Sequence, residues 1–313
     1  SPAALDANTT GSYNTGIGYR ALSANTTASY NTALGYNTLE LNTTGTNNTG
    51  LGTSALQANT TAANNTAVGY YALKVNTTGV NNVAIGANAL DANTTGGETI
   101  CIGKDAGSSL TTAGNNIAIG HQALATSTTA NYNIAIGRDA LNDVTTGYSN
   151  VFVGHWGGDA ITTGYSNIGL GYASLGANTT GVQNVALGGN SLIANTTASN
   201  NTAVGYDSLK ANTTGTSNVA VGTSALAANV TGTQNVAMGH NSMLANTGSY
   251  NTSIGYESLK ANIGGANNTA VGVNALLYNT TGNSNVALGA NALDANTTAS
   301  NNTAVGKDSL GAN

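Results

Sequence analysis

One pattern of apolar and polar positions repeats along the sequence with a period of seventeen residues, as from Gly18 to Gly35. Each repeat contains a short segment such as Asn-Val-Ala-Ile-Gly, and the glycine that closes it recurs eighteen times. The interval is constant except from Gly239 to Gly255, where it is one residue shorter. A fixed period of this kind indicates a stack of similar structural units. We therefore expect one all-β domain over residues 1–313, a parallel β-solenoid with eighteen rungs of seventeen residues.

Two apolar columns run through the repeats at fixed distances from this repeat glycine. The residue just before the glycine is Ile, Leu, Val or Met in all eighteen repeats, for example Ile17, Val68 and Met238. The fourth residue after the glycine is Leu in fifteen repeats. Columns that stay apolar throughout a stack are typical of its interior. We expect these two columns to be buried together as the core.

A third column, two residues before the glycine, is Ala in twelve repeats, as at Ala33, Ala84 and Ala220. Neighbouring side chains of a strand point to opposite faces, so this column lies opposite to the residue just before the glycine. A surface that faces water has no reason to be alanine. We therefore expect a second chain to approach closely along the alanine column.

Asparagine occupies the position four residues before the glycine in seventeen of the eighteen repeats, and Thr99 is the exception. Side-chain amides that repeat at the rung spacing of about 4.8 Å can hydrogen-bond to the rungs above and below. We predict a structural ladder whose members include Asn14, Asn31, Asn48, Asn65, Asn82, Asn116, Asn218 and Asn302.

A second asparagine column lies seven residues after the glycine, within Asn-Thr-Thr, which is also an acceptor sequence for N-glycosylation. Four successive repeats replace this asparagine by Leu110, Ser127, Val144 and Ile161. The apolar replacements favour an inward-facing ladder over a row of glycan carriers. We expect Thr-Thr-Gly, which follows, to form a turn, because Gly and Asn tolerate left-handed backbone angles.

Charged residues make up only 6% of the sequence, and the net charge is −5. This balance disfavours nucleic acid and acidic membranes as partners. No apolar run approaches the roughly 18 residues that a membrane span needs, so we expect no membrane insertion of this segment. Charge gathers two and five residues after the glycine, as at Arg20, Asp105 and Lys260, and these columns should face solvent. The sequence begins and ends within a repeat. We therefore expect residues 1–313 to be the interior of a longer fibre, without caps.

The three histidines, His121, His155 and His240, all follow the repeat glycine directly, in a column where tyrosine also occurs. Their separations of two and five rungs correspond to about 10 and 24 Å. These distances are too long for a shared metal ion or a catalytic triad. We therefore expect no enzyme activity, no catalytic residue, no cofactor and no metal.

Aromatic side chains are the candidate surface contacts, because they supply a large contact area at low entropic cost. The residues in question are Tyr19, Tyr36, Tyr206 and Trp156. Trp156 lies in the stretch 99–163, which departs most from the repeat consensus. There Cys101 occupies the alanine column and is expected to be a small packed thiol. Phe152 replaces Ala where Gly157 and Gly158 replace Ala-Leu, which indicates an exchange of volume in the core.

Residues 82–86 (NVAIG) and 218–222 (NVAVG) resemble the head repeats of YadA-type trimeric autotransporter adhesins, whose motif is NxVAIG. Longer runs such as NTAVGYDSLKANTTG are similar to repeats of phage and giant-virus tail-fibre proteins, and of bacterial fibres that end in an intramolecular chaperone domain. The resemblance covers all eighteen repeats, although repeats in adhesin heads are usually shorter. It implies a left-handed β-roll in a homotrimer whose neighbouring rolls touch along small residues.

Period and resemblance together predict the structural shaft of an extracellular fibre, adhesin-like or tail-fibre-like, on a cell or virion surface. Such a shaft would supply rigid spacing, partner with itself as a homotrimer or end to end, and could attach to a host glycan or protein. One alternative is an ice-binding solenoid, although the column three before the glycine is Thr in eight repeats and Val or Ile in ten. The other is a self-assembling extracellular filament.

Overall fold

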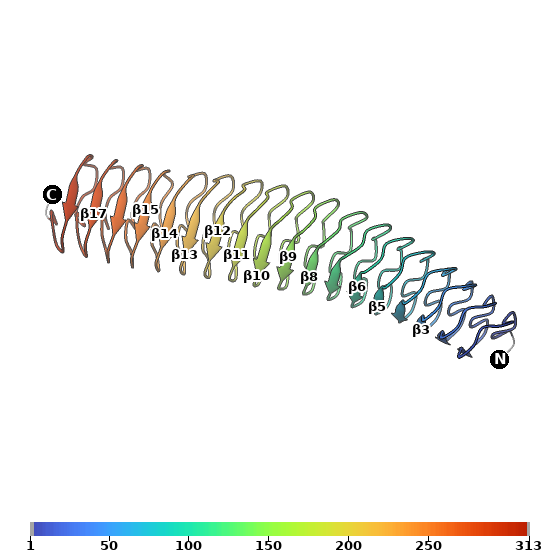
Figure 1. Ribbon diagram of the computed structural model, residues 1–313. Coiled ribbons are helices and arrows are strands. Elements are labelled where there is room, and N and C mark those ends of the chain that lie inside the picture. Colours follow the sequence, from blue (N-terminus) through green and yellow to red (C-terminus); the bar gives the residue numbers. More distant parts are fainter. Residues whose placement is uncertain (1–2, 312–313) are drawn as a thin grey trace. The chain divides into compact units, whose positions relative to one another are not determined.

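The computed structural model describes residues 3–311, and the regular structure in that range is all β-strand (Figure 1). Each repeat contributes one three-residue strand that ends just before the repeat glycine. The strands are β1 (Thr15–Ile17), β2 (Thr32–Leu34), β3 (Thr49–Leu51), β4 (Thr66–Val68), β5 (Val83–Ile85), β6 (Ile100–Ile102), β7 (Ile117–Ile119), β8 (Ile134–Ile136), β9 (Val151–Val153), β10 (Ile168–Leu170), β11 (Val185–Leu187), β12 (Thr202–Val204), β13 (Val219–Val221), β14 (Val236–Met238), β15 (Thr252–Ile254), β16 (Thr269–Val271), β17 (Val286–Leu288) and β18 (Thr303–Val305).

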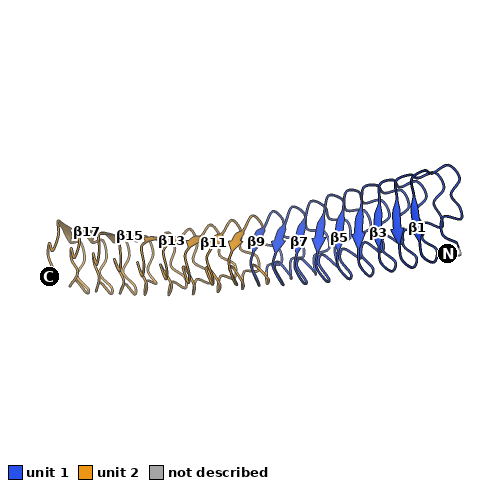
Figure 2. Ribbon diagram, turned by 90° about the horizontal axis from the view of Figure 1, so that it is seen from below, with its two compact units in different colours: residues 1–156, 161–163 blue, residues 157–160, 164–313 orange. Residues whose placement is uncertain are grey.

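The chain forms two compact units, coloured separately in Figure 2. Unit 1 comprises residues 1–156 and 161–163, and unit 2 comprises residues 157–160 and 164–313. Within each unit, every strand pairs in parallel with the next strand along the chain, offset by one repeat, so that Thr66 lies opposite Val83. At one step of unit 2, between β14 and β15, the offset is one residue shorter, so that Val236 lies opposite Thr252. These strands confirm the β-solenoid and its period. The single domain, the left-handed roll and the trimer stay predictions.

Apart from Phe152, which is buried in β9, the strands bury small side chains and expose their large apolar ones, which is the reverse of what we expected. The alanine column is in the interior, with Ala33, Ala84 and Ala220 fully buried. Ile17 is 57% exposed, and none of the eighteen residues just before the repeat glycine is buried. The alternation along the strand is as predicted, but our assignment of its two faces was wrong. The alanine column therefore cannot be the surface that meets a second chain.

The width of the coil explains this reversal. The leucines four residues after the glycine, such as Leu22 and Leu90, are fully buried as predicted and fill the interior. In one rung Gly107 stands in place of this leucine, and a Cβ added there would lie 2.5 Å from Sγ of Cys101 and 2.9 Å from Cδ1 of Leu110. Interiors are close-packed, so a strand position that points inward towards such a leucine has room for alanine but not for a branched side chain.

Left-handed backbone angles recur at three non-glycine positions of the rung, for example Asn81 (φ 60°), Asn88 (φ 54°) and Leu90 (φ 54°). The glycine of Thr-Thr-Gly, such as Gly79, is not among the residues with positive φ, so our explanation of that turn was wrong. The repeat glycine does need its freedom. Its φ is near 135° in most rungs, as at Gly272 (φ 137°), which few other residues adopt.

Both asparagine columns form ladders, as predicted. In the first column the backbone N–H of Asn48 donates to Oδ1 of Asn31 over 2.9 Å. Nδ2 of Asn48 donates to the carbonyl oxygen of Ala62 over 2.8 Å. Each side chain therefore satisfies backbone groups of neighbouring rungs. Most predicted members are buried, and the half-buried ones are Asn14 and Asn302.

In the second column the amides bond to each other directly, as where Nδ2 of Asn59 donates to Oδ1 of Asn42 over 2.8 Å. The members from Asn25 to Asn296 are buried, and so are the replacements Leu110, Ser127, Val144 and Ile161. This confirms the inward orientation. Buried amides of this kind are inaccessible to glycosylation in the folded chain.

Candidate interaction surfaces

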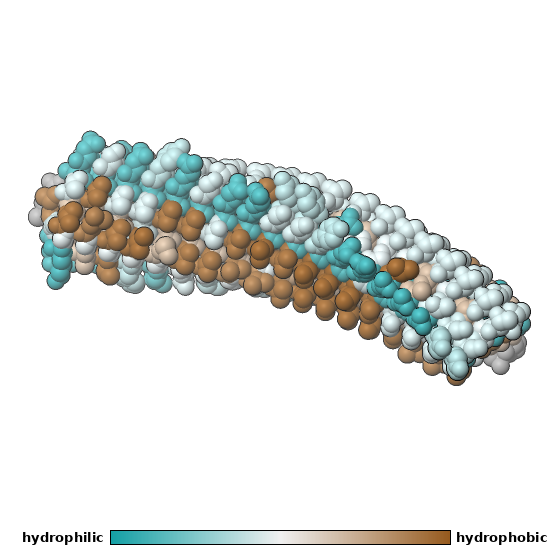
Figure 3. Space-filling model, viewed as in Figure 1, coloured by the Kyte–Doolittle hydropathy of each residue, from teal (hydrophilic) through white to brown (hydrophobic). Residues whose placement is uncertain are grey.

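The outward face of the strands is a band of apolar and threonine side chains. It is formed by the residues three and one before the repeat glycine, such as Val83 and Ile85 of β5, and no charged residue occurs in either column of the described chain. Figure 3 shows hydrophobic side chains gathered in a band over the strands of each unit. Monomeric proteins rarely expose a contiguous apolar patch of this extent, and such patches mark interaction surfaces. Our sequence reading missed this surface because it placed the column of Ile85 in the core.

The four candidate aromatic contacts are all exposed, as predicted. The rings of Tyr19 and Tyr36 stack on each other from successive rungs of unit 1, with centroids 5.3 Å apart. Tyr206 belongs to unit 2, where Nδ2 of Asn190 lies 3.4 Å from its hydroxyl oxygen. Trp156 is 39% exposed and belongs to unit 1. The structure thus brings two of the four together.

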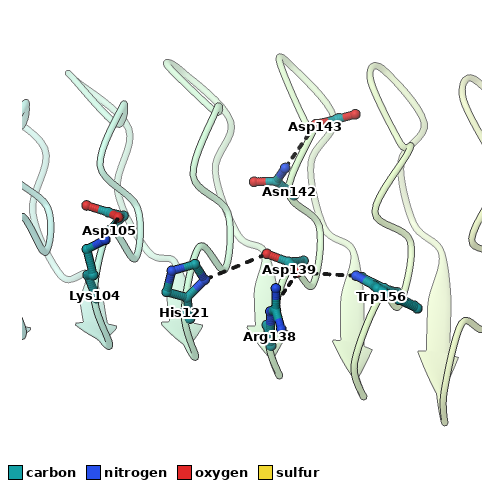
Figure 4. A network of polar contacts seen from close by, with 8 residues as sticks. All are labelled: Lys104, Asp105, His121, Arg138, Asp139, Asn142, Asp143 and Trp156. Atoms are coloured by element: carbon teal, nitrogen blue, oxygen red, sulfur yellow. Dashed lines mark hydrogen bonds and ion pairs between the residues drawn. The ribbon is translucent and has the colours of Figure 1, made fainter.

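Trp156 is part of a polar network in unit 1 that centres on Asp139 (Figure 4). One carboxylate oxygen of Asp139 accepts a hydrogen bond from Nε1 of Trp156 over 3.2 Å and lies 3.1 Å from Nε of Arg138. The other oxygen lies 3.9 Å from Nδ1 of His121. The Asp139 carboxylate thereby holds the Nε edge of the Arg138 guanidinium in place.

A similar arrangement lies two rungs earlier, around Asp105. Its carboxylate accepts a hydrogen bond from Nδ2 of Asn88 over 2.9 Å and lies 3.4 Å from Nζ of Lys104. The hydrogen bond from Asn88, followed by the contact with Lys104, lowers the pKa of the Asp105 carboxyl. The carboxylate is therefore ionised at neutral pH, with the cation beside it.

Four basic side chains occupy the column directly after the glycine in four successive rungs, and they are Lys104, His121, Arg138 and His155. We call these four residues the basic row. The side chains of Lys104 and Arg138 are each 63% exposed, whereas those of Asp105 and Asp139 are only 22% and 15% exposed. The cations are thus the outermost groups. Sequence reasoning missed the row because it treated the histidines as variants of the tyrosines in this column. It did not connect them with Lys104 and Arg138, which occupy the same column.

A shallow hollow of about 310 Å³ lies on unit 2, between side chains of three successive rungs. Its lining includes Leu244, Leu277, Tyr278 and an ion pair between Glu257 and Lys260, whose Nζ and Oε1 atoms are 2.8 Å apart. The hydrogen bond within this pair lowers the pKa of Glu257 and raises that of Lys260. The hollow therefore combines apolar walls with a charged pair.

Within residues 3–311, no group of three or more His, Cys, Asp and Glu side chains is placed to hold a metal ion. The same residues form no helix that is long and apolar enough to cross a membrane. Cys101 is a free thiol that is fully buried, and the loss of hydration raises its pKa to about 12. It is a packed, neutral thiol, as predicted.

No protein-family model matches this chain, and no curated protein matches it either. The fold and the period define the class to which the chain belongs, which is the β-solenoid repeat proteins.

Proposed function

We propose that this chain is the rigid shaft of an extracellular fibre, displayed on a cell or a virion, whose copies associate side by side. The observation that carries the proposal is the uncharged apolar band on the outward face of the strands. Removing apolar surface from water contributes about 25 cal/mol per Å². A band that repeats at every rung therefore favours association strongly.

A second copy of the same chain is the occupant that best fits this band. Side chains in the band recur at the rung spacing of about 4.8 Å. A partner with the same spacing can interdigitate with them at every rung, and another stack of this repeat has that spacing. The lack of charge in the band also removes repulsion between identical copies. The resemblance to trimeric adhesin heads sets the expected number of copies at three.

The role of the assembly follows from its repetition. In a solenoid each rung contacts only its neighbours, so length grows by adding rungs without changing the cross-section. We propose that the shaft supplies spacing and stiffness, and that it has no catalytic function and needs neither cofactor nor metal. Exposed aromatic side chains such as Tyr19, Tyr36 and Trp156 would supply contacts to a surface glycan or protein.

The test is the mass of the native particle in solution, compared with the 30.8 kDa chain, by native mass spectrometry. We expect three chains per particle. A triple variant places lysine in the band, and its matched control places lysine on the exposed turn of the same three rungs. The two variants are Ile85→Lys/Ile102→Lys/Ile119→Lys and Thr95→Lys/Thr112→Lys/Thr129→Lys.

The band variant should be a folded monomer and the turn variant a trimer, with similar circular dichroism spectra, because both sets of positions lie at the surface of the chain. A wild-type monomer would overturn the proposal. In that case thermal hysteresis would distinguish an ice binder, for which the band would be the ice face. An open-ended distribution of masses would indicate a self-assembling filament.

A further inference from the structure

We propose that the basic row of Lys104, His121, Arg138 and His155 binds a linear acidic polysaccharide, which lies along the solenoid axis of unit 1. This inference specifies the attachment partner in the proposed function. It uses residues outside the apolar band, so self-association and polysaccharide binding can fail separately.

The cations of the row are held in place and still available. Arg138 uses Nε to contact Asp139, so its two terminal nitrogens have no protein partner among the described residues. A guanidinium that presents two parallel N–H groups is suited to bidentate binding of a carboxylate or sulfate. Nζ of Lys104 lies 3.4 Å from Asp105, at the long end of an ion pair, and its side chain is mostly exposed. Both cations can therefore reach an anion from solvent.

The carboxylates beneath the row are already engaged. Asp105 accepts a hydrogen bond from Asn88, and Asp139 accepts one from Trp156. Both are far less exposed than the cations beside them. An incoming anion would thus meet the cations first. The carboxylates act as positioning groups that order two long side chains before any ligand arrives, which lowers the entropic cost of binding.

The geometry of the row favours a polymer over a single small anion. The four side chains come from successive rungs and lie along one line, with a total span of about 14 Å. They do not converge on one point, as the ligands of a single phosphate would. A chain that carries acidic groups at intervals can contact several members of the row at once. The exposed indole of Trp156 at one end of the row adds a surface on which a sugar ring can pack.

Charge density favours an acidic polysaccharide over nucleic acid. Only two members of the row, Lys104 and Arg138, carry a permanent charge, and the chain as a whole is at −5. Binding to nucleic acid rests on the neutralisation of many phosphates by Lys and Arg, and a −5 chain repels the rest of such a polymer. A polysaccharide with fewer charges per unit length needs fewer cations.

The experiment measures binding of the full chain to immobilised hyaluronan, a linear polysaccharide with one carboxylate per disaccharide, at low salt, with neutral dextran and duplex DNA as comparison ligands. The variant Lys104→Gln/Arg138→Gln removes both permanent charges of the row. Its matched control, Lys210→Gln/Lys260→Gln, also removes two cations that are each paired with a carboxylate, but these do not lie in the row. The native mass of each variant is measured alongside.

We expect wild type to bind hyaluronan but not dextran, and binding to weaken by about tenfold or more in the row variant, since charge-assisted hydrogen bonds are lost. The control variant should stay within about twofold of wild type, because scattered charges add little at the surface. The proposal would be overturned if wild type did not bind hyaluronan, if both variants lost binding equally, or if duplex DNA bound equally tightly. An unchanged native mass in the row variant separates any loss of binding from a loss of assembly.

Discussion

The backbone N–H of Asn116 donates to Oγ1 of Thr99 over 3.5 Å, whereas one rung later the N–H of Asn133 donates to Oδ1 of Asn116 over 2.9 Å. Threonine is too short to reach the next rung as asparagine does. Threonine also has no side-chain amide, so it cannot reproduce the hydrogen bond that Nδ2 of Asn116 donates to the carbonyl oxygen of Ala130 over 2.8 Å. The first ladder therefore has one weak step, and it lies inside unit 1.

Replacing Thr99 by Asn should strengthen this step. The variant adds one good hydrogen bond and improves another in a buried setting, so we expect a gain of about 1 kcal/mol in the free energy of unfolding. The reverse change, Asn116→Thr, should cost about 1–3 kcal/mol because it leaves buried backbone groups poorly satisfied. Thermal melts of both variants provide the check. A lower Tm for Thr99→Asn would show that the short side chain of Thr99 does not weaken the ladder.

The core around Cys101, Gly107 and Leu110 should tolerate substitution of all three residues together but not substitution of Gly107 alone. Leucine at position 107 matches the repeat consensus, yet it would collide with Cys101 and Leu110, so Gly107→Leu should destabilise by about 1–3 kcal/mol. The triple variant Cys101→Ala/Gly107→Leu/Leu110→Asn restores the consensus. It also offers a partner to Oδ1 of Asn93, which is buried without a hydrogen bond.

We expect the triple variant to return to within about 1 kcal/mol of wild type in chemical unfolding, because it restores the combination of Ala, Leu and Asn that packs in the consensus rungs. A triple variant as unstable as Gly107→Leu alone would contradict the exchange of volume between these positions.

The buried thiol of Cys101 predicts a pH dependence with a defined sign. Burial raises its pKa to about 12, whereas a thiol in an unfolded chain ionises at about pH 8.5. The raised pKa means that its contribution to stability is fully present below about pH 8.5 and is lost as pH rises towards 12, by about 1.4 kcal/mol per pH unit. Between pH 7 and pH 10, wild type should therefore lose about 2 kcal/mol relative to Cys101→Ala.

The comparison with Cys101→Ala cancels the titration of the tyrosines, which both proteins share. Tm values of the two proteins at both pH values give the measurement. Alkylation of the thiol at pH 8 should proceed only as fast as the chain opens. A parallel pH response in both proteins, or labelling at the rate of a free thiol, would show that the rung around Cys101 is open to water.

The repeat glycine should be the position least tolerant of a side chain. At Gly272 a Cβ would lie 2.5 Å from the carbonyl oxygen of Gly289 in the next rung, and φ is 137°. We expect Gly272→Ala to cost about 3 kcal/mol or more, from strain and from displacement of the neighbouring backbone. Gly264 in the same unit has no atom within 4 Å of its Cβ position, so Gly264→Ala should be neutral or slightly stabilising. Equal Tm shifts in the two variants would count against this account.

The prediction of the site from sequence succeeded for single residues and failed for surfaces. Exposure of Tyr19 and Trp156 could be predicted because their columns also carry charged or polar residues. The basic row and the contact between Asp139 and Trp156 depend on which side chains from different rungs lie side by side. Those neighbours are 17 residues apart, and they follow from the sequence only once the register of the rungs is known.

By itself, the sequence determined the period, the alternation of side chains before the repeat glycine, the two ladders and the buried leucine column, because each of these recurs at a fixed place in every rung. Only the tertiary structure decided which face of the strand is inside. Alternation along a strand is the same whether Ala84 or Ile85 points inward, and hydrophobicity alone favours Ile85. The choice depends on the width of the closed coil, in which Leu90 and its equivalents leave space for a methyl group only. The apolar side chains just before the repeat glycine are therefore displayed outside, where they form the band that we propose as the contact surface.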